Sequence, residues 1–117
     1  MYTVYGIPNC DVIKKAVTWL QDHKIGYEFH DYKKQGIDEA TLQNWCKQLG
    51  YDAIFNKRST TWKELGEAVQ STVTDERSAI RIMTEHNSII KRPVIVKGGK
   101  VIAVGFDAKK YAELFRS

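Results

Sequence analysis

The sequence predicts an α/β fold in which helices cover a mixed four-stranded sheet and a helical segment interrupts the sheet-forming parts. Three observations predict it. The N-terminal residues read as strand, helix and strand, residues 93–115 read as a hairpin followed by a helix, and the apolar spacing at about residues 37–88 is helical. A chain of 117 residues suits one domain, so we expect residues 1–117 to form a single domain that carries this helical insertion.

The N-terminal strand, helix and strand supply the first half of the expected sheet. Residues 2–5 are aromatic and β-branched, and residues 27–31 read as a second strand. Between them, apolar side chains recur at helical spacing over residues 12–20, with Asn9 as the candidate N-cap. A βαβ unit of this length has parallel strands and a right-handed crossover.

The middle of the chain is predicted to be helical. One apolar helix face ends at Gly50, Leu65 and Val69 indicate a short second helix, and a third helix is expected after Asp75. Residues 33–36 read as a polar loop that is too short to separate domains.

The C-terminal part completes the sheet. Two β-branched runs, residues 93–96 and 101–104, flank the pair Gly98-Gly99, which is a strong signal for a two-residue hairpin. Asp107 can cap a final helix. The complete order of elements is that of the thioredoxin fold with a helical insertion, so we expect a thioredoxin-like sheet.

Composition and charge narrow the class of protein. The chain starts without a basic leader and has no apolar run of about 18 residues, so we expect a soluble, cytoplasmic protein with reduced thiols. The net charge is +4, but 18 basic residues are interspersed with 14 acidic ones, which argues against a nucleic-acid surface. We expect a monomer with neither a membrane nor a nucleic acid as partner.

Cys10 is the residue with the clearest chemical potential. It lies where the first helix begins, and free backbone N–H groups and the helix dipole favour a thiolate there, although the dipole contributes only about 0.3–1 kcal/mol. The neighbouring Asp11 opposes a thiolate, so an active Cys10 needs a cation from elsewhere. Arg92 and Arg58 are the two candidates, and the thioredoxin fold places a cis-proline at Pro93 beside the reactive helix. From position alone, Cys10 is either a working thiolate or a small hydrophobic residue.

The other sulfur and imidazole groups are interpreted as structural. Cys46 falls on the apolar side of its helix beside Trp45, which predicts core packing. No metal-ligand spacing links the histidines to one another or to the cysteines, so we expect no metal site and no bound cofactor. These histidines are His23, His30 and His86.

Four motifs carry a resemblance to a known family. They are "YGIPNC" with its following helix, "NKRSTTWKELG", "KRPVIV" and "VGFD", and together they cover nearly the whole chain. The sequence resembles the ArsC family, the glutaredoxin-linked arsenate reductases and their relatives. It is most similar to the YffB-type branch of that family.

The resemblance implies a site and a chemistry. Cys10 would be the single nucleophile, in a basic pocket formed with Arg92 and Arg58, and Pro93 and Asn9 would complete the glutathione- or anion-binding site. In the arsenate reductases the cysteine attacks arsenate, glutathione forms a mixed disulfide with the product, and glutaredoxin resolves it. Glutathione is therefore the implied co-substrate and glutaredoxin an implied partner.

Departures from the arsenate reductases narrow this prediction. Those enzymes place a histidine where this chain has Gly6, and a third arginine where it has Val104 or Gly105. Their central arginine aligns most simply with Asn56, so the role of Arg58 rests on the YffB-type match. We therefore expect that arsenate is not the natural substrate.

A third group of relatives, the Spx-type regulators, carries Cys-x-x-Cys at this position. The fourth residue here is Ile13, which excludes a disulfide within the loop. The leading hypothesis is a glutathione-dependent thiol oxidoreductase with Cys10 as nucleophile. The alternatives are arsenate reduction proper and a non-catalytic, Spx-like module that binds RNA polymerase.

Overall fold

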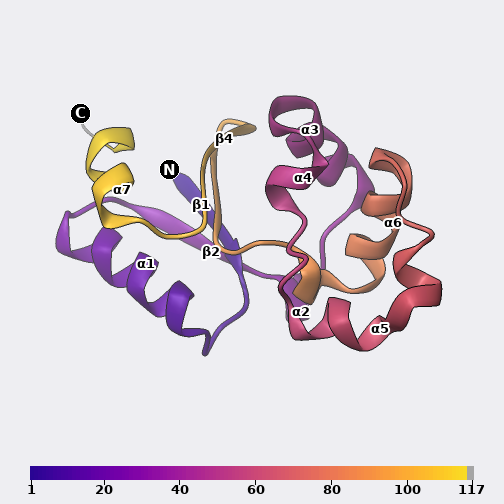
Figure 1. The fold of residues 1–117 in the computed structure, drawn as a ribbon. Helices are drawn as coiled ribbons and strands as arrows, with labels where there is room; N and C mark the ends of the chain where they lie inside the picture. Colours follow the sequence, from indigo (N-terminus) through magenta and orange to yellow (C-terminus); the bar gives the residue numbers. More distant parts are fainter. Residues whose placement is uncertain (116–117) are drawn as a thin grey trace. The chain divides into compact units, whose positions relative to one another are not determined.

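The computed structural model describes residues 1–115 (Figure 1). The chain divides into two compact units. Residues 1–35 combine with the described residues from 92 onward to form the first, and residues 36–91 form the second. The apolar spacing predicts a helical insertion at about residues 37–88.

The first unit is built on a four-stranded sheet. Its strands are β1 (Tyr2–Gly6), β2 (Tyr27–Asp31), β3 (Val94–Lys97) and β4 (Lys100–Val104), in the order β2-β1-β3-β4. β1 pairs parallel with β2 and antiparallel with β3, and β3 pairs antiparallel with β4. The predicted mixed sheet is confirmed, including its parallel N-terminal strands.

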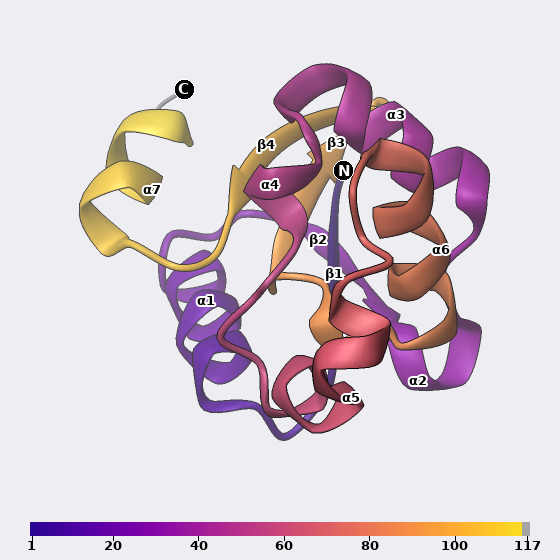
Figure 2. The ribbon, with the colours of Figure 1, turned by 45° about the vertical axis from the view of Figure 1, so that its right-hand side comes forward.

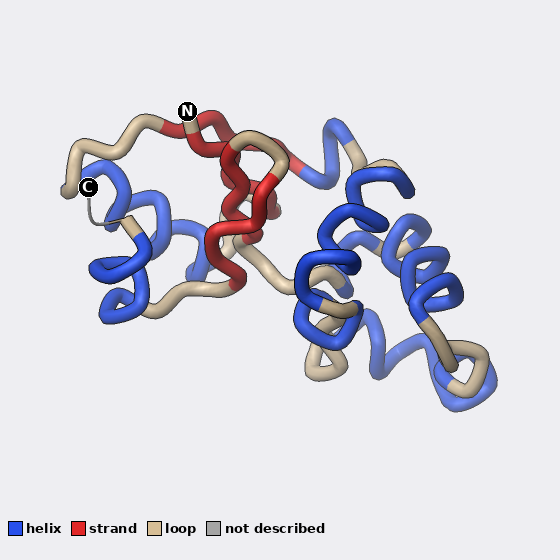
Figure 3. Tube along the Cα trace, turned by 90° about the horizontal axis from the view of Figure 1, so that it is seen from above, coloured by secondary structure: helices blue, strands red, loops and turns tan. Residues whose placement is uncertain are grey.

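Two helices cover the same face of this sheet. They are α1 (Asp11–Asp22) and α7 (Ala108–Leu114), which lie on one side of the strands in Figure 3. The indole of Trp19 meets the ring of Tyr111 edge to face, with centroids 5.4 Å apart. Burial of these apolar side chains is the main stabilising contribution to the unit. The buried core on this face consists of Val4, Ala16, Leu20, Ile95, Ala103 and Tyr111.

The local signals at the C-terminal end of the chain are confirmed. Gly98 and Gly99 have φ of 58° and 81°, so the hairpin uses the two left-handed positions that a two-residue turn requires. The Asp107 side chain accepts hydrogen bonds from the N–H groups of Lys109 and Lys110, which caps α7.

The connection after β2 differs from the prediction. Residues 33–36 were expected to form a polar loop, but the structure has a short helix, α2 (Tyr32–Gln35). Asp31 accounts for the difference. Its carboxylate accepts a hydrogen bond from the N–H of Lys33 at 2.8 Å, and its own N–H donates to the Gln35 side chain at 3.1 Å. These two bonds stabilise a helical turn that the polar composition alone did not reveal.

The second unit consists of helices, with one isolated β-bridge between Phe55 and Ile90 (Figure 2). Three helices were expected, and the structure adds the short α4 and η1. Helix α6 packs against α3 and α4. The elements are α3 (Glu39–Leu49), α4 (Tyr51–Ile54), α5 (Thr60–Gln70), α6 (Glu76–Glu85) and the 3₁₀ helix η1 (Asn87–Ile89).

Side-chain caps fix where these helices begin. Asp38, Ser59 and Asp75 each accept a hydrogen bond from the backbone N–H three residues later. The expected start of a helix after Asp75 is therefore confirmed. Helix α5 bends at Gly66, whose φ of 81° is non-helical. No helix within residues 1–115 is both long and apolar enough to cross a membrane.

Candidate active site

The loop between β1 and α1 places a sulfur at the start of a helix. Asn9 adopts a left-handed backbone with φ of 67°, and Cys10 is extended with φ of −98° and ψ of 132°. An N-cap residue needs an extended backbone, so Cys10 is the N-cap of α1 and the prediction that Asn9 caps it is wrong. The thiol therefore stands where a capping oxygen usually stands.

The surroundings of Cys10 favour a thiolate. Partial burial raises the pKa of the thiol, but a hydrogen bond from the Arg92 side chain and the N–H groups of Ile13 and Val12 outweigh it, so the pKa lies below its ordinary value. Cys10 makes no regular side-chain capping bond in the structure. The two N–H groups nevertheless face the sulfur at the positive end of the helix dipole, and negative charge on the sulfur strengthens this interaction.

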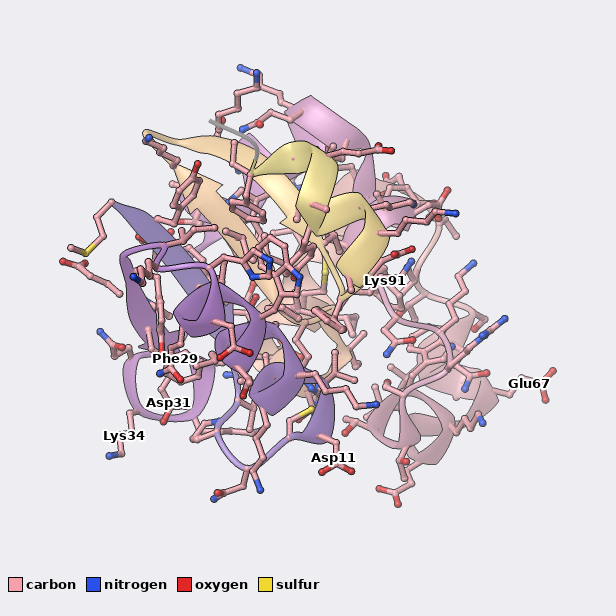
Figure 4. The ribbon with its side chains drawn as sticks, turned by 90° about the vertical axis from the view of Figure 1, so that its left-hand side faces the viewer. Asp11, Phe29, Asp31, Lys34, Glu67 and Lys91 are labelled. Atoms are coloured by element: carbon pink, nitrogen blue, oxygen red, sulfur yellow. The ribbon has the colours of Figure 1, made fainter. Side chains whose placement is uncertain are left out.

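Asp11 opposes the thiolate less than its place in the sequence suggests. Its carboxylate is exposed and points away from the ribbon at the start of α1 (Figure 4). Water screens a charge in this position. The cation at Arg92 therefore acts on Cys10 without strong competition from Asp11.

Sheet pairing brings Arg92 to Cys10. Tyr5 pairs with Val94, so the residues just before β3 lie beside the end of β1, where the Cys10 loop begins. Pro93 is buried, and the Arg92–Pro93 peptide bond is cis, as the thioredoxin fold predicts. Cys10 and Arg92, which are far apart in sequence, thus meet where β1 ends and β3 begins.

Arg58 belongs to the second unit. It lies just before α5, its side chain is exposed, and its N–H donates to Oδ1 of Asn56 at 3.0 Å. The N–H of Asn56 donates to the carbonyl oxygen of Ile89 at 2.8 Å, which fixes the base of this turn. The role of Arg58 beside Cys10 stays a prediction.

Cys46 has the opposite surroundings. Its side chain is only 3% exposed on α3, beside the buried Trp45, which confirms the predicted core packing. Burial, together with the nearby charge of Glu76, raises the pKa of this thiol to about 11. Among residues 1–115, no group of three or more histidine, cysteine or acidic side chains could hold a metal ion.

A sequence model of the ArsC family matches residues 5–114. The chain belongs to the ArsC family. It is 44% identical to an uncharacterized protein of Haemophilus influenzae, over 98% of this chain and 99% of that one. A solved structure of a protein named YffB is 44% identical with a TM-score of 0.92, covering 99% of this chain and 100% of that one. An arsenate reductase (ArsC) related protein from Brucella melitensis is 43% identical with a TM-score of 0.76, covering 99% and 95%.

More distant relatives of this ArsC-family chain are transcriptional regulators. The global transcriptional regulator Spx of Bacillus subtilis is 28% identical, over 92% of this chain and 81% of that one. The resemblance to the ArsC family, to its YffB-type members and, more distantly, to Spx is thus confirmed, together with the thioredoxin-like fold.

The structure couples Gly6 to Ile13. Gly6 is buried, and a Cβ atom added there would overlap the side chain of Ile13 and lie 3.8 Å from the ring of Phe29. A side chain at position 6 therefore requires the Ile13 side chain to move. Only the structure shows that a side chain at position 6 would overlap the side chain of Ile13.

Proposed function

We propose that this protein is a glutathione-dependent thiol oxidoreductase that uses Cys10 as its only nucleophile. The observation that carries the proposal is the placement of Arg92 and two helix N–H groups beside the Cys10 sulfur, which lowers the pKa of the thiol. The thiolate is the form that attacks in thiol–disulfide exchange, so this placement favours the reaction.

The proposed reaction has two exchange steps. The Cys10 thiolate attacks the glutathione sulfur of a mixed disulfide, a Cys10–glutathione disulfide forms, and the substrate thiolate leaves and takes up a proton. A second glutathione thiolate then attacks the glutathione sulfur of that disulfide, which releases oxidised glutathione and restores the Cys10 thiolate. In net, the substrate–glutathione disulfide and one reduced glutathione give the substrate thiol and oxidised glutathione, so no second protein thiol is needed.

The anionic groups of glutathione call for cations. We assign Arg92 to the thiolate and Arg58 to a glutathione carboxylate, because guanidinium groups bind carboxylates in a bidentate manner. Pro93 and Asn9 are proposed to border the bound tripeptide. Glutaredoxin is the proposed protein partner that also resolves the mixed disulfide, and the cytoplasm, where glutathione is reduced, is the proposed compartment.

Intact mass spectrometry after treatment with oxidised glutathione tests the proposal. We expect one glutathione adduct, localised by peptide mapping to Cys10, and no fast adduct in Cys10→Ser. The Cys46→Ala variant is the matched control and should react like the wild type. An adduct that forms no faster on Cys10 than on Cys46 would rule out the nucleophile assignment.

Arsenate reduction is a second candidate because a relative of 43% identity is named as related to arsenate reductase. It predicts arsenate turnover with glutathione and glutaredoxin that disappears in Cys10→Ser. Gly6 weighs against it, because the resemblance implies a histidine at this position in the arsenate reductases and this chain has none. Absence of turnover in the coupled assay would remove this candidate.

The similarity to Spx supports a third candidate, a polymerase-binding module without catalysis. It predicts a stable complex with RNA polymerase that Cys10→Ser leaves intact. A pull-down that recovers no polymerase subunit, performed with protein that reacts with oxidised glutathione, would leave the oxidoreductase as the supported function.

A further inference from the structure

Tyr111 of α7 is buried, and its hydroxyl reaches the segment that follows β4. The hydroxyl donates a hydrogen bond to the carbonyl oxygen of Gly105 at 2.6 Å. The N–H of Gly105 donates in turn to the carbonyl oxygen of Pro93 at 2.8 Å. Pro93 follows Arg92 directly, and the Arg92 side chain donates to the sulfur of Cys10. Two hydrogen bonds and one peptide bond therefore link Tyr111 to the residue that supplies the cation.

The bond between Gly105 and Pro93 extends the pairing of β3 with β4 by one residue. Val94 pairs with Val104, so Pro93 and Gly105 are the next residues on the two strands. Gly105 has φ of 80°, a left-handed conformation that turns the chain out of the direction of β4. The Tyr111 hydroxyl therefore holds the peptide group at which the hairpin ends.

The ring of Tyr111 contacts the other half of the candidate site. It meets the indole of Trp19 on α1 edge to face, with centroids 5.4 Å apart. It also belongs to the same buried core as Ala16 and Leu20 of that helix. Cys10 is the N-cap of α1. One side chain thus packs on the helix that begins at the sulfur and bonds to the segment that carries the cation.

Burial keeps the Tyr111 hydroxyl a hydrogen-bond donor. It raises the pKa of the phenol well above its ordinary value, so the hydroxyl stays protonated over the whole range in which the Cys10 thiol titrates. A buried tyrosine hydroxyl needs a hydrogen-bond partner, and the carbonyl oxygen of Gly105 is that partner here. The bond is therefore a permanent part of the fold at the pH values that matter for the thiol.

We propose that Tyr111 is a positioning residue for Arg92, and that its hydroxyl, acting through Gly105 and Pro93, holds the guanidinium beside the sulfur of Cys10. The hydroxyl fixes the backbone from which the Arg92 side chain extends, and the ring fixes the helix that begins at Cys10. A hydrogen bond weakens when its distance and angle change, so a shift of either element weakens the contact between guanidinium and sulfur. This inference rests on the proposed role of Cys10 as the nucleophile.

The test measures the rate of Cys10 alkylation by iodoacetamide as a function of pH in protein that lacks Cys46 (Cys46→Ala). Tyr111→Phe removes the hydroxyl and keeps the ring, so the core stays filled. We expect the Cys10 pKa to rise and the rate at pH 7 to fall about twofold to threefold, because the rate follows the thiolate fraction. In protein that also carries Arg92→Ala, Tyr111→Phe should have no further effect on the Cys10 pKa, because the hydroxyl acts through Arg92.

Gly105→Ala perturbs the same link from its other side. The added methyl group meets no atom within 4 Å, but alanine tolerates a φ of 80° poorly, so the peptide group should move away from the Tyr111 hydroxyl. The Cys10 pKa should rise as it does in Tyr111→Phe. The two changes together should raise it by less than the sum of the two single effects.

Tyr27→Phe is the matched control, since the Tyr27 hydroxyl accepts a hydrogen bond from the side chain of Gln21, near the other end of α1, at 3.0 Å. It should leave the Cys10 pKa unchanged. An unchanged Cys10 pKa in Tyr111→Phe or in Gly105→Ala overturns the inference, as does an equal shift in Tyr27→Phe or a Tyr111→Phe shift that persists without the Arg92 side chain. An ordinary thiol pKa for Cys10 in the parent protein would contradict the proposed function itself.

Discussion

The two cysteines of this chain show how strongly surroundings decide the chemistry of one side chain. Cys10, at the start of α1, has its pKa lowered, whereas the pKa of Cys46, inside α3, is raised to about 11. Burial raises the pKa at both positions. Only Cys10 has a guanidinium and free helix N–H groups to reverse that effect.

Helix position is the main lesson of this comparison. The N–H groups within α3 are already bonded along the helix, so they cannot stabilise a charge on Cys46. At the first turn of α1 they have no intrahelical partner, and the sulfur of Cys10 takes that place. A cysteine in a helix is therefore a candidate nucleophile when it is the N-cap and a cation reaches it, which Arg92 does here.

The largest expected effect is the difference in reactivity between the two thiols. At pH 8 a thiol with a pKa of about 11 is roughly 0.1% thiolate, so native Cys10 should be alkylated at least about 100 times faster than Cys46. Quenched iodoacetamide labelling with peptide mapping measures both rates. In denaturant the rates should converge, and equal rates in the native protein would remove the contrast between the two positions.

The same shifts set the pH dependence of stability. The folded-state pKa of Cys46 lies above its ordinary value of 9.0, so unfolding releases a proton between about pH 9 and 11, and its contribution to the free energy of unfolding falls across that window. Cys10 acts in the opposite direction, because its lowered pKa stabilises the fold as the pH rises through the folded-state pKa toward 9.0.

A second prediction tests whether the lowered pKa of Cys10 depends on the packing of α1 against Gly6 through Ile13. Gly6→Ala puts a methyl group against Ile13 and should reduce the free energy of unfolding by about 1–3 kcal/mol and raise the Cys10 pKa. Ile13→Val removes the overlapping methyl group, so the double variant should lose less than the sum of the two single changes. Chemical denaturation and alkylation measure the two effects.

The control for this change is Gly26→Ala, whose new methyl group meets only the end of the Met1 side chain, at 3.8 Å. It should change stability by less than about 0.5 kcal/mol. Strict additivity of Gly6→Ala and Ile13→Val would contradict the steric coupling between these positions.

A third prediction concerns Arg92, the cation that lowers the pKa of Cys10 and has no counterpart at Cys46. Arg92→Ala should raise the Cys10 pKa and slow its alkylation at pH 7 severalfold, because a hydrogen bond and a positive charge are lost together. Arg92→Lys should fall between the wild type and alanine. The control Lys100→Ala removes an exposed charge from the hairpin. An equal rise of the Cys10 pKa in this variant would mean that the net charge of the protein, and not the position of Arg92, lowers that pKa.

The smallest expected effect concerns the backbone before Cys10. Asn9→Ala should destabilise the fold by about 1 kcal/mol and slow Cys10 modestly, because alanine tolerates a φ of 67° less well than asparagine does. Asn9→Gly should retain both stability and reactivity, since glycine accepts this conformation. Loss of glutathione affinity in the glycine variant would instead assign a binding role to the Asn9 side chain.

The sequence was sufficient where a local signal determines the structure. The Gly98-Gly99 hairpin, the Asp107 cap and the parallel strands on either side of α1 follow from short-range chemistry and apolar spacing. The N-cap of α1 was misassigned because asparagine is both a capping residue and one that favours the left-handed conformation, and Asn9 has the second role. The helical turn after Asp31 was missed because two of its hydrogen bonds use side chains.

Only part of the candidate site could be predicted from the sequence. Cys10 and Arg92 were named from their positions at a helix start and before a proline. The contact of Gly6 with Ile13 depends on how α1 packs against the loop before it. This relation leaves no periodic signal along the chain.

The discontinuous sheet has a consequence for biosynthesis. β1 and Cys10 leave the ribosome early, but β3 and Arg92 follow only after the whole helical segment 36–91 has been made. Until β3 pairs with β1, the thiol has no guanidinium beside it and reacts as an ordinary cysteine. The cation that lowers the pKa of Cys10 is thus in place only once the sheet is complete.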